Sequence, residues 1–121
     1  MTETYFDTSI VIDMLSGHHL AMAEFRRVSR PWISRVTWLE VMAAVPAPAR
    51  DETESFLANF STREISPEIA RRAAMMRVDR PGLSLPAALV FAAAQDHGAI
   101  LVTRNIKDFP ANIPGIRVPY T

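Results

Sequence analysis

Two carboxylates stand in apolar surroundings, where an acidic residue needs an explanation. Asp7 ends one apolar segment and begins the next, a position that a helix N-cap would also explain. Glu40 is the only charged residue between Arg35 and Arg50. A carboxylate on so apolar a helix is expensive to bury unless it is paired or binds a metal ion. We therefore predict a functional role for both, and a distant arginine partner remains the alternative for Glu40.

A third group of oxygen donors follows a buried strand near the end of the chain, with Asn105 and Asp108 in one short loop. Carboxylate and amide oxygens, without cysteine or paired histidine, suit a hard cation such as Mg²⁺ or Mn²⁺. Such a site can polarise a phosphodiester and activate a bound water. We expect Asp13 to be solvated or to cap the first helix, and Asp96 to be solvated. None of the three histidines has the spacing of a metal ligand.

Short apolar strands alternate with helices along the whole chain, and this alternation positions the acidic residues. The pattern predicts strands at 3–7, 32–34, 63–65, 99–103 and 116–118, and helices at 10–15, 19–29, 36–45, 51–60, 66–79 and 85–98. It favours one α/β domain over residues 1–121, a three-layer α/β/α arrangement with a mostly parallel sheet. In such sheets the active crevice lies at the carboxyl ends of the strands, which selects residues 7–9, 34 and 103–105.

Composition excludes several classes of protein. The 121 residues are 49% hydrophobic, which argues against disorder, and they include no cysteine. A disulfide scaffold, a thiolate zinc site and a cysteine nucleophile are therefore excluded, and a reducing compartment is favoured. No basic residue precedes the first apolar segment as in a signal peptide, and no apolar stretch has the length of a membrane span. We expect a cytoplasmic protein without a membrane partner.

Five segments, taken together and in order, resemble the PIN-domain family, and within it the VapC toxins of bacterial type II toxin–antitoxin pairs. Each segment carries part of the pattern: an opening strand with the first acid, a helix with the second acid, and a closing helix, strand and loop. The matching segments are residues 5–13, 33–41, 85–94, 97–105 and 107–109. No one of them is specific, but the set spans nearly the whole chain.

The resemblance implies an activity and a set of roles. Asp7 and Glu40 match the first two acidic positions, and Asn105 matches the fourth, with Asp108 close behind it. Ser9, like Thr103, matches a small hydroxyl residue near the metal. The family is expected to bind Mg²⁺ or Mn²⁺, to cleave RNA, to form homodimers, and to be inhibited by a VapB-like antitoxin that lays a segment along the toxin.

One position departs from the family's pattern. The residue after Pro86 should be the third acid, and here it is Ala87. Alanine is the best helix former, so the change is chemical rather than structural. Loss of one carboxylate should weaken metal binding and slow the reaction. Either the substitution was made to silence a toxic nuclease, or the chain is a naturally degenerate copy that acts only as an antitoxin- or RNA-binding module.

Binding of a polyanion beside an acidic site requires flanking cations. The net charge is zero, and Lys107 is the only lysine among thirteen basic residues. An arginine-rich composition suits phosphate contacts, and it is equally what a GC-rich genome encodes. We predict RNA contacts by Arg104, Lys107 and Arg35. Two further groups of residues suggest binding surfaces. A basic run is a candidate RNA surface, with an ordinary solvated face as the alternative: Arg71, Arg72, Arg77 and Arg80. An apolar set is a candidate antitoxin groove, with burial in the core as the alternative: Met22, Phe25, Phe56 and Phe60.

Two other phosphotransfer folds are disfavoured by single residues. A phosphatase of the haloacid dehalogenase type, with Asp7 as nucleophile, would need a second aspartate where Ser9 stands. A receiver domain would need an acidic pair at the end of the first strand and a lysine after a later one, and neither arrangement is present.

Overall fold

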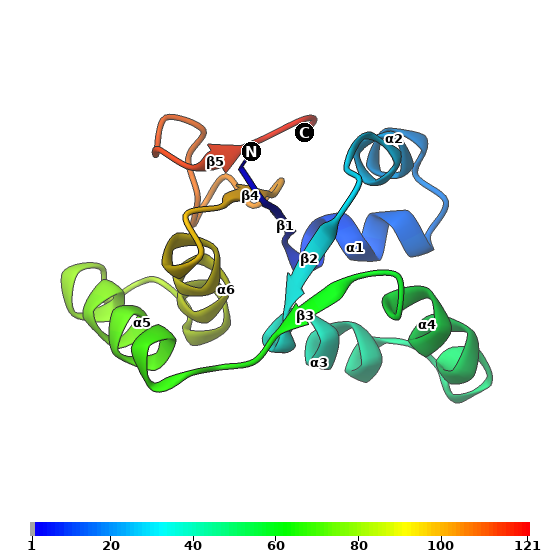
Figure 1. Cartoon of the computed structure of the whole chain (residues 1–121), viewed down its shortest axis with the longest axis horizontal. Helices are drawn as coiled ribbons and strands as arrows, with labels where there is room; N and C mark the ends of the chain where they lie inside the picture. The colour runs from blue at the N-terminus through cyan, green and yellow to red at the C-terminus, as the bar shows by residue number, and fades with distance from the viewer. Residues whose placement is uncertain (1) are drawn as a thin grey trace.

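A sheet of five parallel strands forms the centre of the computed structural model, which describes residues 2–121 (Figure 1). The strands are ordered β3-β2-β1-β4-β5, and every neighbouring pair runs in the same direction. Their bounds are β1 Thr4–Phe6, β2 Pro31–Ser34, β3 Ser61–Arg63, β4 Ile100–Val102 and β5 Ile116–Arg117. The predicted α/β fold with a parallel sheet is confirmed.

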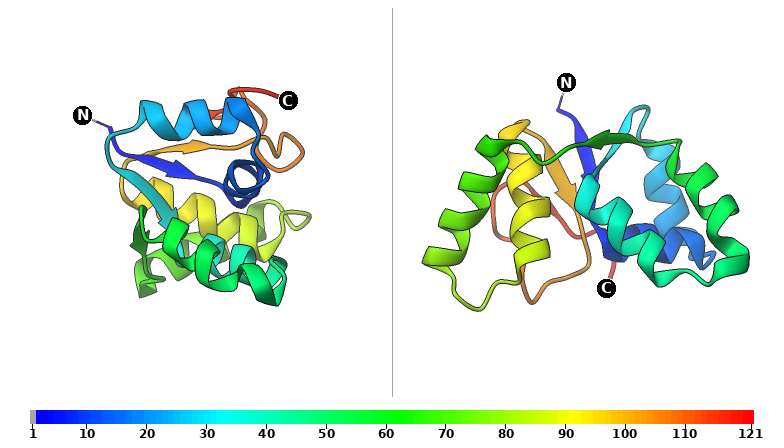
Figure 2. Two further views of the ribbon diagram at one scale, coloured as in Figure 1. Left: turned by 90° about the vertical axis from the view of Figure 1, so that its right-hand side faces the viewer. Right: turned by 90° about the horizontal axis from the view of Figure 1, so that it is seen from below.

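Helices cover both faces of this sheet and complete the three layers. The helices are α1 Thr8–Leu15, α2 His19–Arg27, α3 Arg35–Ala44, α4 Arg50–Leu57, α5 Pro67–Asp79 and α6 Leu85–Asp96, with a short 3-10 turn at Ala47–Ala49. In the right-hand view of Figure 2, α5 and α6 lie on one side of the strands and α1 to α4 on the other. Two hydrophobic clusters fill the two interfaces.

The central strands are mostly apolar because they are buried on both faces. Tyr5 packs in the cluster beneath α5 and α6, whereas Phe6 packs in the cluster beneath α1, α2 and α4. Leu101 and Val102 divide in the same way. This period-two alternation between two buried faces is typical of a parallel sheet covered by helices.

The element boundaries differ from the predicted ones mainly where the local pattern is poor. The strand expected at 63–65 is β3, two residues earlier, and it pairs Ser61 with Trp32 and Arg63 with Ser34. This edge strand carries polar side chains without alternation, so the sequence does not fix its register. The second and fourth helices each end two to three residues before their predicted ends.

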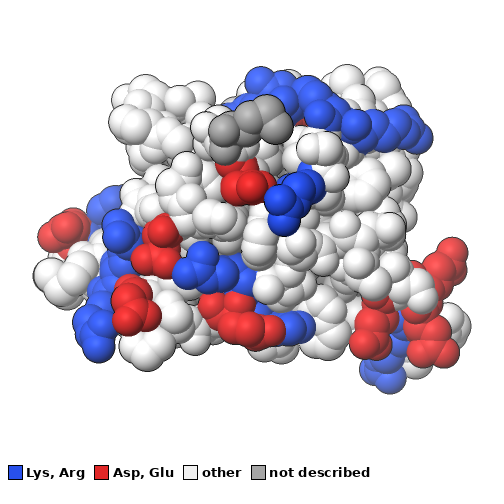
Figure 3. Space-filling model, viewed as in Figure 1, with Lys and Arg blue, Asp and Glu red and all other residues white. Residues whose placement is uncertain are grey.

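The exterior is of mixed charge. On the face shown in Figure 3, acidic and basic side chains are interspersed over α4 and α5, in keeping with the net charge of zero. Among residues 2–121, no helix is both long enough and apolar enough to traverse a bilayer.

Candidate functional site

The order of the strands places the candidate site at the carboxyl ends of β1 and β4. The chain passes from β1 to β2 on one side, and β4 lies on the other side of β1, so the strand order reverses between β1 and β4. Ligand sites in open α/β sheets form at such a switch point. Asp7 follows β1 and Thr103 follows β4, and the Asp7 N–H donates to the Val102 carbonyl oxygen at 2.9 Å.

A cavity of about 640 Å³ opens at this point. It is lined by residues from α1, α3, the start of α6 and the loop after β4: Asp7, Thr8, Ser9, Glu40, Ser84, Pro86, Ala87, Val90, Arg104, Asn105, Ile106 and Lys107. Eight of these were selected from the sequence, and segments about 100 residues apart supply them. The cavity therefore brings together Asp7, Glu40, the position of the missing acid and two predicted cations.

Asp7 is a buried carboxylate without a cation beside it. Its residue is 7% exposed, and burial raises the pKa of its carboxyl, as does the nearby charge of Glu40. Hydrogen bonds from Thr103 at 2.6 Å and Ser9 at 3.3 Å hold the same carboxylate oxygen and oppose this rise of the pKa. Asp7 occupies the N-cap position of α1, but its side chain makes no capping hydrogen bond, so helix capping does not account for it.

Glu40 faces the cavity from α3 and is held by hydroxyl groups. The Thr8 hydroxyl donates to its Oε1 atom at 2.7 Å and lies 3.1 Å from the Thr37 hydroxyl oxygen. Thr37 precedes Glu40 by three residues, so both lie on the same face of the helix. Across residues 2–121 no ion pair involves Asp7 or Glu40. The alternative of an arginine-paired Glu40 is therefore not observed.

Ala87 occupies the first turn of α6 and faces the two acids. The Ser84 hydroxyl caps this helix by accepting from the Ala87 N–H at 3.2 Å, and Pro86 stands in the first turn, where its missing N–H costs nothing. Ala87 is 8% exposed and lines the cavity. A longer side chain at this position would enter the cavity, as the family's third acid would.

Asn105 lines the cavity, whereas Asp108 does not. The Asn105 amide donates to the Asp108 carboxylate at 3.0 Å, and its backbone N–H donates to the Thr103 hydroxyl at 3.0 Å. Asp108 thus orients Asn105 from behind, and its backbone carbonyl accepts from Arg80 at 2.7 Å. Of the two oxygen donors predicted in this loop, Asn105 is the one that lines the cavity, and its Oδ1 atom accepts from the Asp108 backbone N–H at 3.4 Å.

The predicted phosphate contacts divide into two groups. Arg104 and Lys107 line the cavity. Arg35 lies outside it: its guanidinium donates twice to Glu64, once at 2.9 Å, and stacks 5.1 Å from the Trp38 ring centroid. The four arginines of the basic run also lie outside the cavity. Of these, Arg77 donates to the Leu83 carbonyl oxygen.

Two aspartates expected to be solvated are instead paired. Asp13 accepts two hydrogen bonds from the Arg104 guanidinium, at 2.7 and 3.1 Å, and one from the Tyr120 hydroxyl at 2.8 Å. Asp96 accepts from Arg63 at 2.6 Å. The local sequence carries no sign of either pair, because the partners are far apart along the chain.

The donor set agrees with a hard cation in type and falls short in number. Asp7 and Glu40 present carboxylates and Asn105 an amide to one cavity, without cysteine or histidine among its lining residues. Within residues 2–121, however, no group of three or more His, Cys, Asp or Glu side chains is placed to hold a metal ion. Ala87 is the position where a third carboxylate would stand.

A second, more apolar groove of about 610 Å³ lies between α1, α2 and α4, beside the end of α3. Met22 and Phe56 line it. Phe25 and Phe60 pack with Phe56 in the core cluster on that side of the sheet. The predicted apolar set therefore divides between a groove and the core.

Comparisons with known proteins agree with this architecture. The family model described as PIN domain matches residues 4–111. A toxin–antitoxin complex from Klebsiella pneumoniae contains a chain 38% identical to this one, with a TM-score of 0.89 and coverage of 98% of both chains. DNA-bound VapBC from Salmonella typhimurium is 23% identical, with a TM-score of 0.76 over 97% of this chain and 96% of that chain. FitAcB from Neisseria gonorrhoeae is 17% identical, with a TM-score of 0.77 over 96% and 97%. No curated protein matches the chain.

Proposed function

The chain belongs to the PIN-domain family, in its VapC toxin branch, and from this premise we propose that it is the toxin of a toxin–antitoxin pair whose acidic cavity is a metal-dependent endoribonuclease site silenced by Ala87. The observation that carries the proposal is the meeting of Asp7, Glu40 and Ala87 in one cavity. Among residues 2–121 no ion pair involves either acid, and the position of the missing acid lines the same cavity.

Asp7 and Glu40 are the residues that would hold Mg²⁺ or Mn²⁺, with Asn105 as a neutral oxygen donor. The ion would polarise the phosphodiester and favour ionisation of a water at neutral pH. Thr103, through its 2.6 Å hydrogen bond, fixes the orientation of the Asp7 carboxylate, and Thr8 does the same for Glu40. Such outer contacts normally tune metal affinity by about 10- to 100-fold.

Arg104 and Lys107 would bind the RNA backbone beside the acids. Both lie in the loop after β4 and line the cavity, so a phosphate in the cavity would meet cations on one side and the carboxylates on the other. Pro86, Val90 and Ile106 give the cavity apolar wall atoms. These would exclude water from the reacting phosphate and strengthen its electrostatic contacts.

The test compares this chain with its Ala87→Asp variant. We expect the variant to bind Mn²⁺ about tenfold or more tightly than this chain, and to cleave a fluorophore–quencher-labelled single-stranded RNA of mixed sequence. Cleavage should stop with EDTA and in the Ala87→Asp/Glu40→Gln double variant. An Ala87→Asp variant that is folded, binds Mn²⁺ and still leaves the RNA intact would contradict the nuclease proposal.

Ala87 itself favours a second candidate, a degenerate domain that only binds an antitoxin or RNA. In that case this chain would shift the fluorescence anisotropy of the labelled RNA, and the Ala87→Asp variant would bind it without cleaving it. The same two proteins therefore separate the two functions.

We further propose that the groove lined by Met22 and Phe56 receives an apolar segment of a VapB-like antitoxin. Amphipathic helices dock into grooves of this kind through spaced apolar anchors. The chain is 38% identical to one in a toxin–antitoxin complex, which supports a partner of this class.

We also propose a homodimer formed through α5. Met75 and Val78 on this helix are 58% and 68% exposed. Arg71 precedes Met75 by four residues and Asp79 follows it by four, and all three line one shallow hollow. Two antiparallel copies of α5 that cross at Met75 would bring each Arg71 to the Asp79 of the second copy, as an isologous two-fold interface requires.

Residues 1–121 are proposed to form one PIN domain in the cytoplasm. The two hydrophobic clusters pack on the two faces of one sheet, which supports the single domain. The absence of cysteine supports the location.

A further inference from the structure

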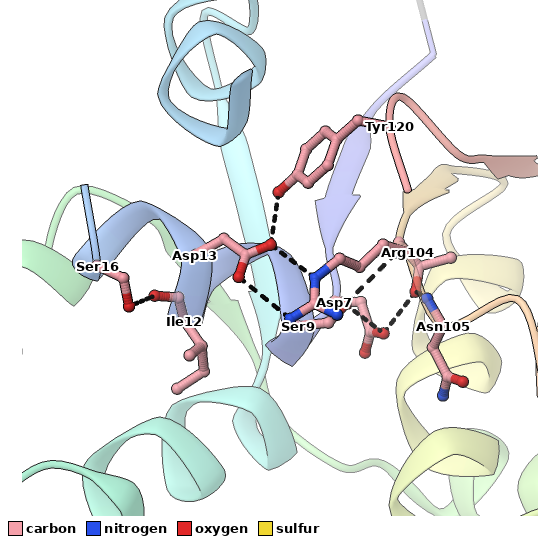
Figure 4. A network of polar contacts seen from close by, with 9 residues as sticks. Asp7, Ser9, Ile12, Asp13, Ser16, Arg104, Asn105 and Tyr120 are labelled. Atoms are coloured by element: carbon pink, nitrogen blue, oxygen red, sulfur yellow. Dashed lines mark hydrogen bonds and ion pairs between the residues drawn. The ribbon is translucent and has the colours of Figure 1, made fainter. Parts of the chain in front are cut away.

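A polar network links the C-terminal segment to the mouth of the acidic cavity (Figure 4). The Asp13 carboxylate on α1 lies at its centre. It accepts from Arg104 Nε at 2.7 Å and Nη2 at 3.1 Å, and from the Tyr120 hydroxyl at 2.8 Å. Figure 4 shows Tyr120 reaching Asp13 from the C-terminal segment, with the Arg104 side chain between Asp13 and the Asp7–Ser9 corner.

Arg104 is a cation that lines the same cavity as Asp7 and Glu40, two carboxylates that no ion pair involves among residues 2–121. Its backbone N–H donates to the Ser9 hydroxyl at 3.4 Å, and that hydroxyl donates to Asp7 at 3.3 Å. The charge of Asp7 contributes to raising the pKa of Arg104, although the hydrogen bonds to Asp13 are the main cause. A long, flexible side chain at this position could therefore turn from Asp13 toward Asp7 and Glu40. There it would partly neutralise the acids and occupy part of the cavity.

Asp13 prevents this by offering a better partner. Two parallel N–H···O bonds between a guanidinium and a carboxylate are among the strongest polar contacts in proteins. Asp13 is mostly buried, with 14% of its side chain exposed, which reduces screening of the pair by solvent. Arg104 is 43% exposed, so its remaining N–H groups stay accessible from the cavity mouth.

Tyr120 in turn holds the Asp13 carboxylate, which is the acceptor for Arg104. Its ring stacks on His18, with centroids 4.5 Å apart, and its hydroxyl donates to the Asp13 oxygen that accepts from Arg104 Nε. Burial, with the adjacent Asp13 charge, holds the pKa of Tyr120 above its ordinary range, so the hydroxyl remains a donor at physiological pH. The C-terminal segment is thereby tied to the cavity through one carboxylate.

We propose that Asp13 and Tyr120 are positioning residues that hold the Arg104 guanidinium away from Asp7 and Glu40, and so keep the acidic pair open for a divalent cation. The inference rests on the proposed function only for the identity of the cation. The position of the guanidinium is a property of the chain alone, and it is tested without any metal.

The first experiment is a crystal structure of the Asp13→Asn variant, which keeps the size of the side chain and removes its charge. We expect the Arg104 guanidinium to lie within hydrogen-bond distance of Asp7 or Glu40. A guanidinium that stays beside the introduced amide, or that points into solvent, would overturn the proposal. Glu24→Gln is the matched control, because Glu24 also accepts two hydrogen bonds from an arginine, Arg117, outside the cavity.

The second experiment measures Mn²⁺ binding by calorimetry in the Ala87→Asp background, where the acidic set is complete. Asp13→Asn should weaken Mn²⁺ binding about tenfold or more, and Arg104→Gln added to it should restore the affinity. Tyr120→Phe should weaken it less, since it leaves the pair and the stack with His18 in place. Glu24→Gln should leave it unchanged. Rescue by Arg104→Gln would not occur if Asp13 served only the stability of the fold.

The outcomes separate the inference from the proposed function. If the Ala87→Asp chain binds no Mn²⁺, the metal site is refuted, and the crystal structure of Asp13→Asn alone decides where Arg104 goes. If Mn²⁺ binds and Asp13→Asn does not change the affinity, or Arg104→Gln does not restore it, the positioning role is refuted while the metal site stands.

Discussion

At the scale of single residues, the site is defined by two carboxylates that no ion pair involves among residues 2–121. Asp7 is buried and is held by hydrogen bonds from two hydroxyl groups and from the Thr8 backbone, and Glu40 adds a like charge nearby. In most cores such a group would be selected against, because burial of an unpaired charge destabilises the protein. The proposed metal site gives a reason for its presence, because such a site needs a negative cavity.

The burial of Asp7 predicts a gain in stability when its charge is removed. Because the folded-state pKa of this acid is raised, its ionised form opposes folding. This destabilisation of the folded state is absent below the ordinary aspartate pKa of 3.8, and it grows as the pH rises through the pKa of the folded state. Asp7→Asn should therefore raise the free energy of unfolding at pH 7 by about 0.5–2 kcal/mol, as removal of other functional strain does.

Urea denaturation of the unsubstituted chain and Asp7→Asn at pH 7 and at about pH 3.5, below the ordinary aspartate pKa, checks this prediction. The difference between the two proteins should shrink at the lower pH, where the native carboxyl is protonated. A variant less stable than the unsubstituted chain at pH 7 would show that the hydrogen bond from Thr103 outweighs the cost of burial.

At the scale of the elements, turns and end contacts hold the helices that carry the site. Helix α6 ends in a Schellman motif, in which the Gly98 N–H donates to the Gln95 carbonyl oxygen and the Ala99 N–H donates to the Ala94 carbonyl oxygen. Gly98 has a φ of 62°, and no atom lies where its Cβ would be. The chain needs glycine here for its backbone conformation and not for space.

Gly98→Ala should therefore destabilise the fold by about 1–2 kcal/mol through backbone strain alone. Gly82→Ala is the matched control, since its Cβ would also meet no atom and its φ is not positive. Chemical denaturation of both variants gives the comparison. Equal stability of the two variants would contradict the explanation by φ.

Helix α2 is joined to the edge strand β5 by Glu24 and Arg117, whose two hydrogen bonds are 2.9 and 3.0 Å long. The Arg117 hydrogen bonds hold the pKa of Glu24 below the ordinary glutamate value of 4.5. The stability from this pair is present above that value and is lost as the pH falls through the folded pKa. Glu24→Gln should lower the free energy of unfolding by about 1–3 kcal/mol at pH 7, and by progressively less below pH 4.5.

Thermal unfolding across this pH range tests the pair. Arg27→Gln provides the control, because Arg27 bonds the same carboxylate from one turn away with 48% of its side chain exposed. We expect its effect to stay below about 1 kcal/mol, as for other exposed ion pairs. A pH-independent loss in Glu24→Gln would point to packing instead of charge.

At the scale of the whole molecule, the two proposed partner surfaces lie on different elements. The apolar groove lies between α1, α2 and α4, whereas the proposed dimer surface is on α5, across the sheet (Figure 2). An antitoxin segment and a second copy of the chain could therefore bind at the same time.

The dimer surface predicts a change in mass on substitution of Met75. Met75→Glu should weaken self-association at least about tenfold, since it places two like charges at the two-fold axis. Arg71→Asp should do the same, and Asp79→Arg added to it should restore the dimer. Leu39→Glu, at a residue of α3 with the same 58% exposure, is the control. Sedimentation velocity reads all four variants, and an unchanged mass in Met75→Glu would refute the surface.

The departure at Ala87 was visible only through the resemblance to the PIN-domain family. The sequence alone determined the alternation of strands and helices and singled out Asp7 and Glu40 as acids in apolar segments. These are local properties: hydrophobic period, helix caps and one unexpected charge in an apolar segment. From the strand ends it followed that Asp7 and residues 103–105 would gather, because parallel strands share their carboxyl edge. The register of β3 was not predictable, since its residues carry no alternation.

Only the tertiary structure decided which polar groups became partners. Asp13 pairs with Arg104, 91 positions away, and with Tyr120, 107 positions away. Arg35 pairs with Glu64 and leaves the cavity to Arg104 and Lys107. A charged side chain carries no local record of its partner, because the pair forms when packing of the apolar faces brings distant segments together. The apolar pattern therefore predicts the fold, and the fold then determines which distant polar side chains become partners around the cavity.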